Sequence, residues 1–156
     1  MKITLLVVGK TVVPWVKAGL DEYASRLKHY IPFEVVEVPD LKGAASLTEA
    51  QIKEKEGALI LKAAGDAGII LLDEHGKSFR SIDFASELQK KLSHASKDIC
   101  FVVGGAYGFS QEVYSKASGK ISLSPMTFNH QMVRTIFAEQ LYRAFTIMKG
   151  EPYHHE

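Results

Sequence analysis

The chain has 156 residues, the length of one ordinary domain, and its 46% hydrophobic and 24% charged residues form a globular composition that excludes intrinsic disorder. Nineteen Lys and Arg against 18 Asp and Glu leave a net charge of +1, which excludes binding to nucleic acid as a general polycation. A single cysteine, Cys100, excludes an intrachain disulfide, and no apolar run approaches the roughly 20 residues of a membrane-spanning helix.

The first half of the chain alternates between two apolar periodicities. Continuous apolar runs closed by glycine or proline predict strands that are buried on both faces. Ser46, with Glu49 three residues later, predicts a capping box for the second helix. The predicted elements are a strand over 3–8, a helix from Pro14, a strand over 33–38, a helix reaching about Ala64, and a strand over 67–72 with an exit turn over 73–76.

The second half continues the alternation. The predicted elements are a helix capped by Ser81, a strand over 99–103, a short helix over about 110–117, a short strand over 121–124 and a last helix over about 131–149. This order predicts one α/β domain over residues 1–156, with a mainly parallel sheet and helices on both faces. Because ligands of such sheets bind beyond the carboxyl ends of the strands, we expect the site after Leu72, Val103 and Ser124.

Two segments at these strand ends have an unusual composition. The glycines of residues 104–108 either let a ligand lie against the main chain or form a tight turn. Residues 122–128 are largely apolar and contain a proline, so they are either buried or line an apolar pocket that holds a flat ring. Gly76-Lys77-Ser78 is not a phosphate loop, because position 71 is Leu where that motif needs glycine.

Basic residues surround the last predicted helix. Arg134 and Arg143 are about two and a half helical turns apart and lie on opposite faces. They are either solvated or serve two partners or two subunits. The tail over 152–156 ends in aromatic and titratable residues, although chain termini usually fray. No set of histidines, cysteines and carboxylates has metal-ligand spacing, so we expect no metal.

A resemblance to a known family covers essentially the whole chain in order. The residues that carry it are Lys2 to Lys10, Leu72-Asp73, Val103 to Gly108, Leu123 to Phe128, His130 to Arg134, Glu139 to Arg143, and the closing Pro152-Tyr153-His154 with Glu156. In combination these motifs resemble the ribosomal RNA large subunit methyltransferase H family. Its members are small SPOUT-class enzymes that methylate N3 of a pseudouridine in 23S ribosomal RNA.

The resemblance implies a fold and a cofactor. The fold would contain a C-terminal trefoil knot, an exception to the rule that chains do not thread loops. The cofactor would be S-adenosylmethionine, bound in the knot. Carried over by motif, its contacts are Leu72, Gly104, Leu123, Ser124, Pro125, Met126, Thr127 and Phe128. These residues fall in the strand-end segments that the pattern of elements already singled out.

The resemblance also implies a reaction and its residues. The N3 proton of the pseudouridine must leave before the nitrogen attacks the sulfonium methyl group. Arg143, or Arg134 from one subunit, would favour the resulting anion, and Tyr153 or His154 could relay the proton if the tail folds over the cofactor. The implied catalytic residues are therefore Arg143, Tyr153 and His154. His130, Arg134 and His155 would bind the RNA, with the role of His155 open.

The implied partners are a second copy of the chain and 23S ribosomal RNA within the large subunit or the whole ribosome, in the cytoplasm. A homodimer would use basic residues on two faces of one helix. The net charge of +1 favours a substrate that is presented by an assembled ribosome over naked RNA. Two alternatives stay open: a non-catalytic nucleotide-binding module associated with the ribosome, and a SPOUT methyltransferase that acts on transfer RNA.

Overall fold

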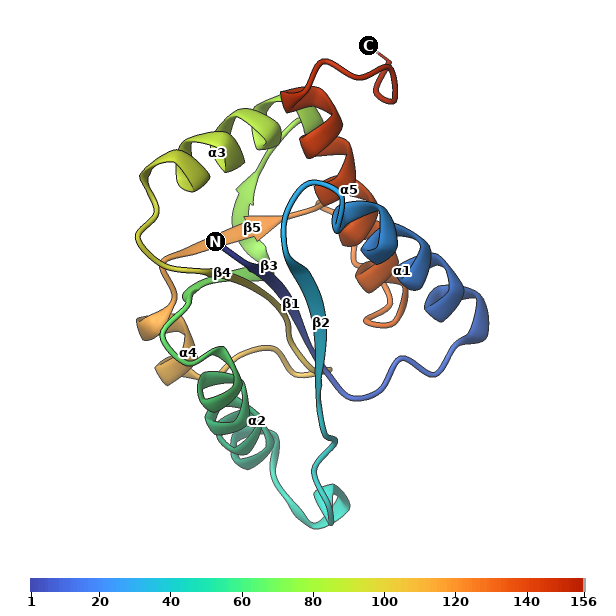
Figure 1. Ribbon diagram of the computed structural model, residues 1–156. Coiled ribbons are helices and arrows are strands. Elements are labelled where there is room, and N and C mark those ends of the chain that lie inside the picture. The colour runs from blue at the N-terminus through green and yellow to red at the C-terminus, as the bar shows by residue number, and fades with distance from the viewer. Residues whose placement is uncertain (156) are drawn as a thin grey trace.

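The computed structural model describes residues 1–155 and forms one five-stranded parallel sheet in the order β2-β1-β4-β3-β5 (Figure 1). The strands are β1 Ile3–Val8, β2 Phe33–Val38, β3 Gly68–Ser78, β4 Ile99–Val103 and β5 Gly119–Ser122. The α-helices are α1 Pro14–Leu27, α2 Glu49–Ala64, α3 Ser81–His94, α4 Gln111–Lys116 and α5 Met132–Met148, and η1 Ala44–Ser46 is a 3-10 turn. The predicted α/β class with a parallel sheet is confirmed.

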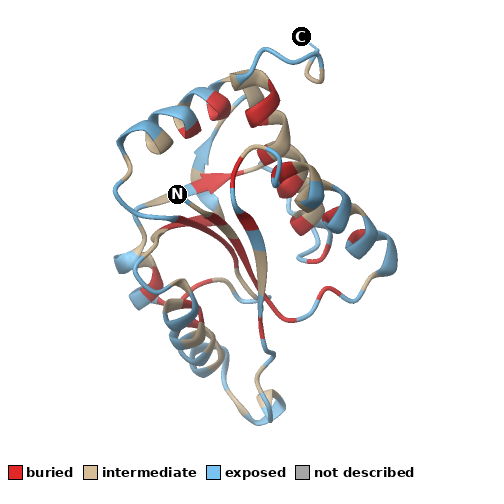
Figure 2. Cartoon of the chain, in the orientation of Figure 1, coloured by how far each residue is buried: buried red, intermediate tan, exposed pale blue. Residues whose placement is uncertain are grey.

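Helices cover both faces of the sheet, which leaves the central strands buried (Figure 2). Leu5, Val7 and Phe101 point to the face under α1, α3 and α5. Leu6 and Cys100 point to the opposite face, under α2 and α4. Alternate residues of one strand thus enter two separate cores, and this accounts for the unbroken apolar runs in β1 and β4. Within residues 1–155, no helix is long and apolar enough to cross a membrane.

The capping box of α2 lies two residues later than predicted. Thr48 is the capping residue: its Oγ1 accepts a hydrogen bond from the Gln51 backbone N–H at 3.1 Å, and the Gln51 side chain accepts one from the Thr48 N–H at 2.9 Å. Ser46 instead belongs to η1, where its hydroxyl donates to the Gly43 carbonyl. The prediction of Ser46 was wrong because Thr48 and Gln51 have the same spacing and chemistry.

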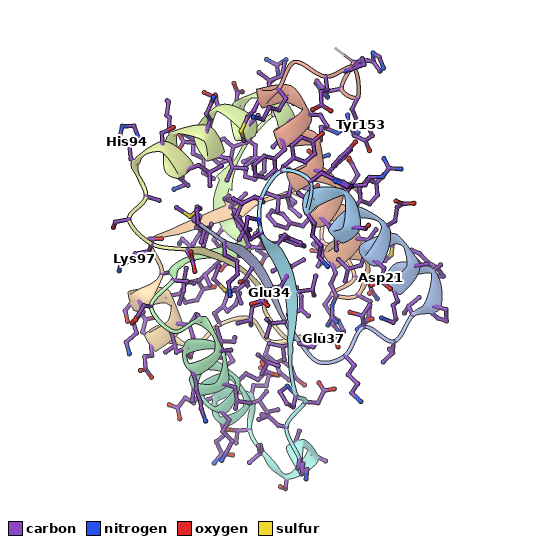
Figure 3. The ribbon with its side chains drawn as sticks, in the orientation of Figure 1. Asp21, Glu34, Glu37, His94, Lys97 and Tyr153 are labelled. Carbon is purple, nitrogen blue, oxygen red and sulfur yellow. The ribbon has the colours of Figure 1, made fainter. Side chains whose placement is uncertain are left out.

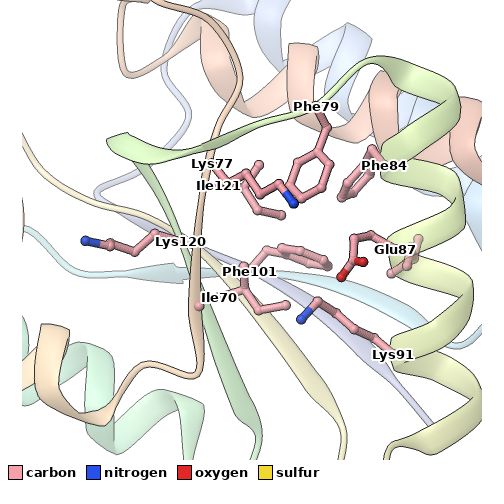
Figure 4. A pocket seen from close by; sticks show the side chains of 11 residues that line it. Ile70, Lys77, Phe79, Phe84, Glu87, Lys91, Phe101, Lys120 and Ile121 are labelled. Atoms are coloured by element: carbon pink, nitrogen blue, oxygen red, sulfur yellow. The ribbon is translucent and has the colours of Figure 1, made fainter.

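Strand β3 runs six residues beyond the predicted end, so the exit turn over 73–76 was wrong. Ile121 of β5 pairs with Leu72 and again with Lys77, on either side of an irregularity in β3. At Gly76 an added Cβ would lie 2.6 Å from the Ile121 backbone nitrogen. Any side chain at this position would therefore collide with the β5 backbone. Figure 4 shows this crossing between the segment that carries Lys77 and the one that carries Lys120 and Ile121.

Residues 123–131 carry the chain from β5, at one edge of the sheet, back to the end of β1. The Gln131 side chain donates to the Lys10 carbonyl at 3.0 Å and accepts from the Val12 N–H at 2.9 Å. Helix α5 then packs between α1 and α3. This return path, together with the crossing at Gly76, is consistent with the predicted trefoil knot, which itself stays a prediction.

Candidate functional site

A cleft of about 810 Å³ opens at the carboxyl ends of β3, β4 and β5. Its volume lies in the range of cofactor and substrate pockets. The residues predicted to contact a cofactor that line it are Leu72, Gly104, Leu123, Ser124, Met126, Thr127 and Phe128. Pro125 lies between two lining residues without lining the cleft itself. Three strand ends that are far apart in the chain thus meet at one cavity, as the parallel sheet predicts.

One wall of the cleft contains three glycines. Gly104, Gly105 and Gly108 belong to the loop between β4 and α4, and the Gly108 N–H donates to the Gly105 carbonyl at 3.2 Å. A Cβ on Gly104 would lie 2.9 Å from the Phe109 ring, and Gly108 has a φ of 83°, which favours glycine. A ligand can therefore lie directly against the main chain here.

The opposite wall is the proline-containing segment after β5. The Ser124 hydroxyl accepts a hydrogen bond from the Met126 N–H at 2.9 Å, and the Ser122 hydroxyl donates to the Ser124 carbonyl at 3.1 Å. These bonds hold a tight turn that presents Leu123 and Phe128 to the cleft. Of the two interpretations of this segment, the structure favours the apolar pocket wall. Met126, 78% exposed, extends beyond it.

Asp73 forms a hydrogen-bonded cluster in the floor of the cleft. Its carboxylate accepts from the Tyr114 hydroxyl and from both the backbone N–H and the ring of His75. Burial opposes the charge of Asp73, but these hydrogen bonds outweigh it and lower the pKa. Burial and the Asp73 carboxylate raise the pKa of Tyr114 to about 12, so its hydroxyl remains a donor.

Helix α2 contributes a charged face that the sequence analysis did not assign to the site. Glu49 and Lys53, four residues apart, line the cleft. Glu56 follows one turn later on the same side, against the glycine loop. Burial, with the nearby Asp40, raises the pKa of the Glu56 carboxyl group. The spacing of these three residues was visible in the sequence, but α2 was interpreted only as a covering helix.

Arg134 corrects an expectation, since it is fully buried and does not face a substrate. Its guanidinium donates to the Val8 carbonyl at 2.8 Å, the Gly9 carbonyl at 2.9 Å and the Thr11 hydroxyl at 2.8 Å. A fourth bond goes to the His130 carbonyl at 3.1 Å. Burial lowers the pKa of Arg134. Arg134 joins the start of α5 to the end of β1. It is therefore neither a solvated surface arginine nor an RNA-binding residue.

The predicted catalytic residues gather in a second cluster, at the end of α5. Arg143 donates to His154 Nδ1 at 3.0 Å, and its guanidinium lies 4.8 Å from the centre of the Tyr153 ring. Glu139 bonds both Arg143 and the Tyr153 hydroxyl. The Tyr153 and Tyr23 hydroxyls lie 3.1 Å apart. Tyr153 and His154 are thus held against α5 and α1, although chain termini usually fray.

This tail cluster is remote from the cleft of its own chain. Val133 lines the cleft, and Arg143 lies ten residues further along α5, about 15 Å at 1.5 Å per residue. Figure 3 shows Tyr153 near the last turn of α5 and Glu37 toward the opposite, carboxyl end of β2. Among the predicted substrate residues, His130 lines the cleft and His155 is exposed in the tail. The tail does not fold over this chain's own cleft.

The protonation of the tail limits its chemistry. Because arginine only donates hydrogen bonds, His154 Nδ1 is the acceptor and its ring proton lies on Nε2. Within the described chain, that Nε2 is buried without a partner. Burial and the Tyr23 hydroxyl raise the pKa of Tyr153, so it stays protonated near neutral pH. In this arrangement both side chains offer a proton, and neither is set to accept one.

A smaller cavity of about 100 Å³ lies between β5 and α3, apart from the cleft (Figure 4). Its lining includes the rings of Phe79, Phe84 and Phe101 and the side chains of Lys77 and Lys91. It contains none of the predicted site residues. Among residues 1–155, no group of three or more histidines, cysteines or carboxylates could hold a metal ion.

Comparison with known proteins identifies the family. Residues 1–154 match the family described as Predicted SPOUT methyltransferase. The chain is 57% identical to Ribosomal RNA large subunit methyltransferase H of Parabacteroides distasonis and 54% identical to that of Bacteroides fragilis, over 100% of each chain.

A probable methyltransferase from Bordetella pertussis shares the fold at a TM-score of 0.54 and 11% identity, over 91% of this chain and 93% of its own. A putative RNA methyltransferase from Bacillus anthracis does so at a TM-score of 0.52 and 12% identity, over 100% and 99%. The chain belongs to the SPOUT methyltransferase family.

Proposed function

We propose that this chain transfers the methyl group of S-adenosylmethionine to N3 of a pseudouridine in 23S ribosomal RNA. The observation that carries the proposal is the full-length identity with relatives named Ribosomal RNA large subunit methyltransferase H. The cleft supports it, because seven of the eight residues that the family resemblance assigns to the cofactor line one cavity. Cofactor, target base and dimer are each part of the proposal.

The residues of the cleft fit this cofactor. The bare backbone of Gly104 and Gly105 would lie against its flat ring, with Leu72, Leu123 and Phe128 as the apolar surround. Glu49, Asp73 and Glu74 outnumber Lys53 among the charged lining residues, which suits a ligand that carries a sulfonium cation. When bound, S-adenosylmethionine supplies an electrophilic methyl group.

The reaction then requires that the target base be positioned and that its N3 proton be removed. The N3–H bond of the base breaks, the nitrogen forms the new bond to the methyl carbon, and the electrons of the carbon–sulfur bond remain on sulfur. Arg143 stabilises the developing N3 anion by its charge. In the proposed site the Tyr153 ring stacks on the base, while His154 accepts a hydrogen bond from Arg143 and orients its guanidinium. The N3 proton leaves to water or to a carboxylate, such as Glu139 beside Arg143.

A homodimer brings the two clusters together. The exposed apolar side chains at the starts of α1 and α5, and in the loop before α5, are Val12, Trp15, Met126, Phe128 and Met132. Exposed apolar side chains of this size are typical of interfaces between protein chains, and two of them, Met126 and Phe128, line the cleft. If the α5 helices of two copies pack antiparallel, the tail of one chain reaches the cleft of the other. The active site is then shared between subunits.

The substrate is the assembled ribosome or its large subunit. A chain with a net charge of +1 gains little from the counterion release that holds proteins on naked RNA. Protein and shape contacts of the assembled particle replace that attraction. His130 at the cleft and His155 in the tail are the proposed RNA contacts. Equal methylation rates on ribosomes and on deproteinised 23S RNA would contradict this part of the proposal.

The experiment is mass spectrometry of ribosomal RNA from cells that lack the protein. We expect one pseudouridine of 23S RNA to lose a single methyl group. Purified chain with S-adenosylmethionine should restore that methyl group on ribosomes from the same cells. Methylation restored on transfer RNA instead, or on neither RNA, would overturn the assignment. A variant with Arg143→Ala, beside the exposed Lys62→Ala as a control, tests whether the tail cluster takes part.

A further inference from the structure

Glu56 lies directly behind the glycine wall of the cleft. A Cβ built on Gly105 would lie 2.5 Å and 2.8 Å from the two carboxylate oxygens of Glu56, so the carboxylate faces the main chain of Gly105. The next residue, Gly57, lies equally close to Ser110, where a Cβ would approach the hydroxyl oxygen to 2.5 Å. Consecutive residues of α2 therefore contact both ends of the loop that forms this wall.

One oxygen of the Glu56 carboxylate lacks a hydrogen-bond partner in the part of the chain that the structure describes. Its Oε1 is buried and has no hydrogen-bond partner among residues 1–155. Asp40, at the end of β2, repels it further. A buried carboxylate without a partner costs free energy unless a positive charge comes near it.

The surroundings of Glu56 offer little compensation. On the elements packed against α2, strand β1 has no charged residue, β2 and its exit contribute Glu34, Glu37 and Asp40, and α4 contributes Glu112 paired with Lys116. On α2 itself, Lys53 lines the cleft. A cation that enters the cleft on the other side of Gly105 would therefore offset part of the free energy that burial of the carboxylate oxygen costs.

We propose that Glu56 makes the cleft selective for a cationic ligand, the sulfonium cofactor, over the uncharged thioether that remains after methyl transfer. This inference rests on the proposed function. The absence of side chains on residues 104 and 105 keeps the wall thin, and exclusion of water at Oε1 keeps the field of the carboxylate weakly screened. Glu56 is a positioning residue that acts through the loop and touches neither the base nor the methyl group. Its effect is to favour exchange of spent for fresh cofactor.

The test is calorimetric titration of S-adenosylmethionine and S-adenosylhomocysteine into the full-length protein and its Glu56→Gln variant at pH 8. Glutamine keeps the size of the side chain and removes its charge. We expect the preference for the sulfonium ligand to fall by about tenfold, the scale of one partly screened charge interaction, with the affinity for the thioether nearly unchanged. Exposed Glu54→Gln on the same helix is the matched control and should change neither affinity.

Other outcomes separate the possible failures. Equal weakening of both ligands would show that Glu56 only supports the loop and would overturn the inference. An unchanged ratio would overturn it too. Failure of the unmodified protein to bind either ligand would overturn the proposed function itself. If Glu56→Gln does not fold, as judged by thermal unfolding, Asp40→Asn reduces the negative potential from outside the helix and should lower the same ratio by a smaller factor.

Discussion

Replacing Arg134 with alanine removes the donors of four hydrogen bonds from a fully buried position. The acceptors on Val8, Gly9 and Thr11 stay behind with no solvent to replace the guanidinium. A buried polar group left unpaired costs about 1–3 kcal/mol, so these three acceptors together cost at least about 3 kcal/mol. A protein of this size typically has about 5–15 kcal/mol of stability. The substitution therefore removes a large fraction of the total.

Urea unfolding at a fixed protein concentration measures this loss, and thermal unfolding gives a second reading. At about 2–4 °C per kcal/mol for a domain of this length, the midpoint should fall by about 6–12 °C. Arg134→Lys keeps a charge but replaces the planar fork with a single ammonium, so we expect an intermediate loss. Exposed Lys62→Ala is the control and should change little. A loss below about 1 kcal/mol for Arg134→Ala would refute the buried-network argument.

Gly104→Val should abolish binding of S-adenosylmethionine in calorimetry while the circular dichroism spectrum stays native. A Cβ at this position would lie 2.9 Å from the Phe109 ring, so the loop that lines the cleft must shift. Gly119→Val, which has open space around it, is the control. Deletion of residues 153–156 should lower methyl transfer by about 100-fold with cofactor affinity unchanged; a wild-type rate would remove the tail from the mechanism. Sedimentation should give about twice the 17.3 kDa chain mass, and an active monomer would contradict the shared site. Because burial and Asp40 raise the pKa of Glu56, the preference for the sulfonium ligand should decline as the pH falls, and Glu56→Gln should remove this pH dependence.

Three of the five strands were predicted from the sequence with the bounds that the structure has, at residues 3–8, 33–38 and 99–103. Strands β1 and β4 are buried on both faces and therefore leave continuous apolar runs, whereas β2 has exposed Glu34 and Glu37 and is bounded by Pro39. The end of β3 escaped prediction because residues 73–78 are polar and owe their extended conformation to pairing with β5. The partner strand lies more than 40 residues away in the chain, so the local pattern of apolar residues does not predict this pairing.

The cleft was predictable because it depends on where strands end, and its lining follows from the parallel arrangement. Arg134 was not predictable, since a buried arginine and an RNA-binding arginine look alike in a sequence. The acceptors that bury it come from the end of β1, 123–126 residues earlier. Likewise, the residue spacing placed Glu49, Lys53 and Glu56 on one side of α2, but only the packing of that helix against the glycine loop reveals what this side faces.

The dependence of β1 on Arg134 has a consequence for the order of folding. The Val8 and Gly9 carbonyl groups at the end of β1 receive their hydrogen bonds from Arg134 only after α5 has been synthesised. During synthesis, the first four strands can pair before α5 exists, but the edge of the sheet where the cleft opens stays incomplete. Contacts of such long sequence separation form slowly and late. The cleft and its proposed activity therefore arise only after α5 has been made and has packed against the end of β1.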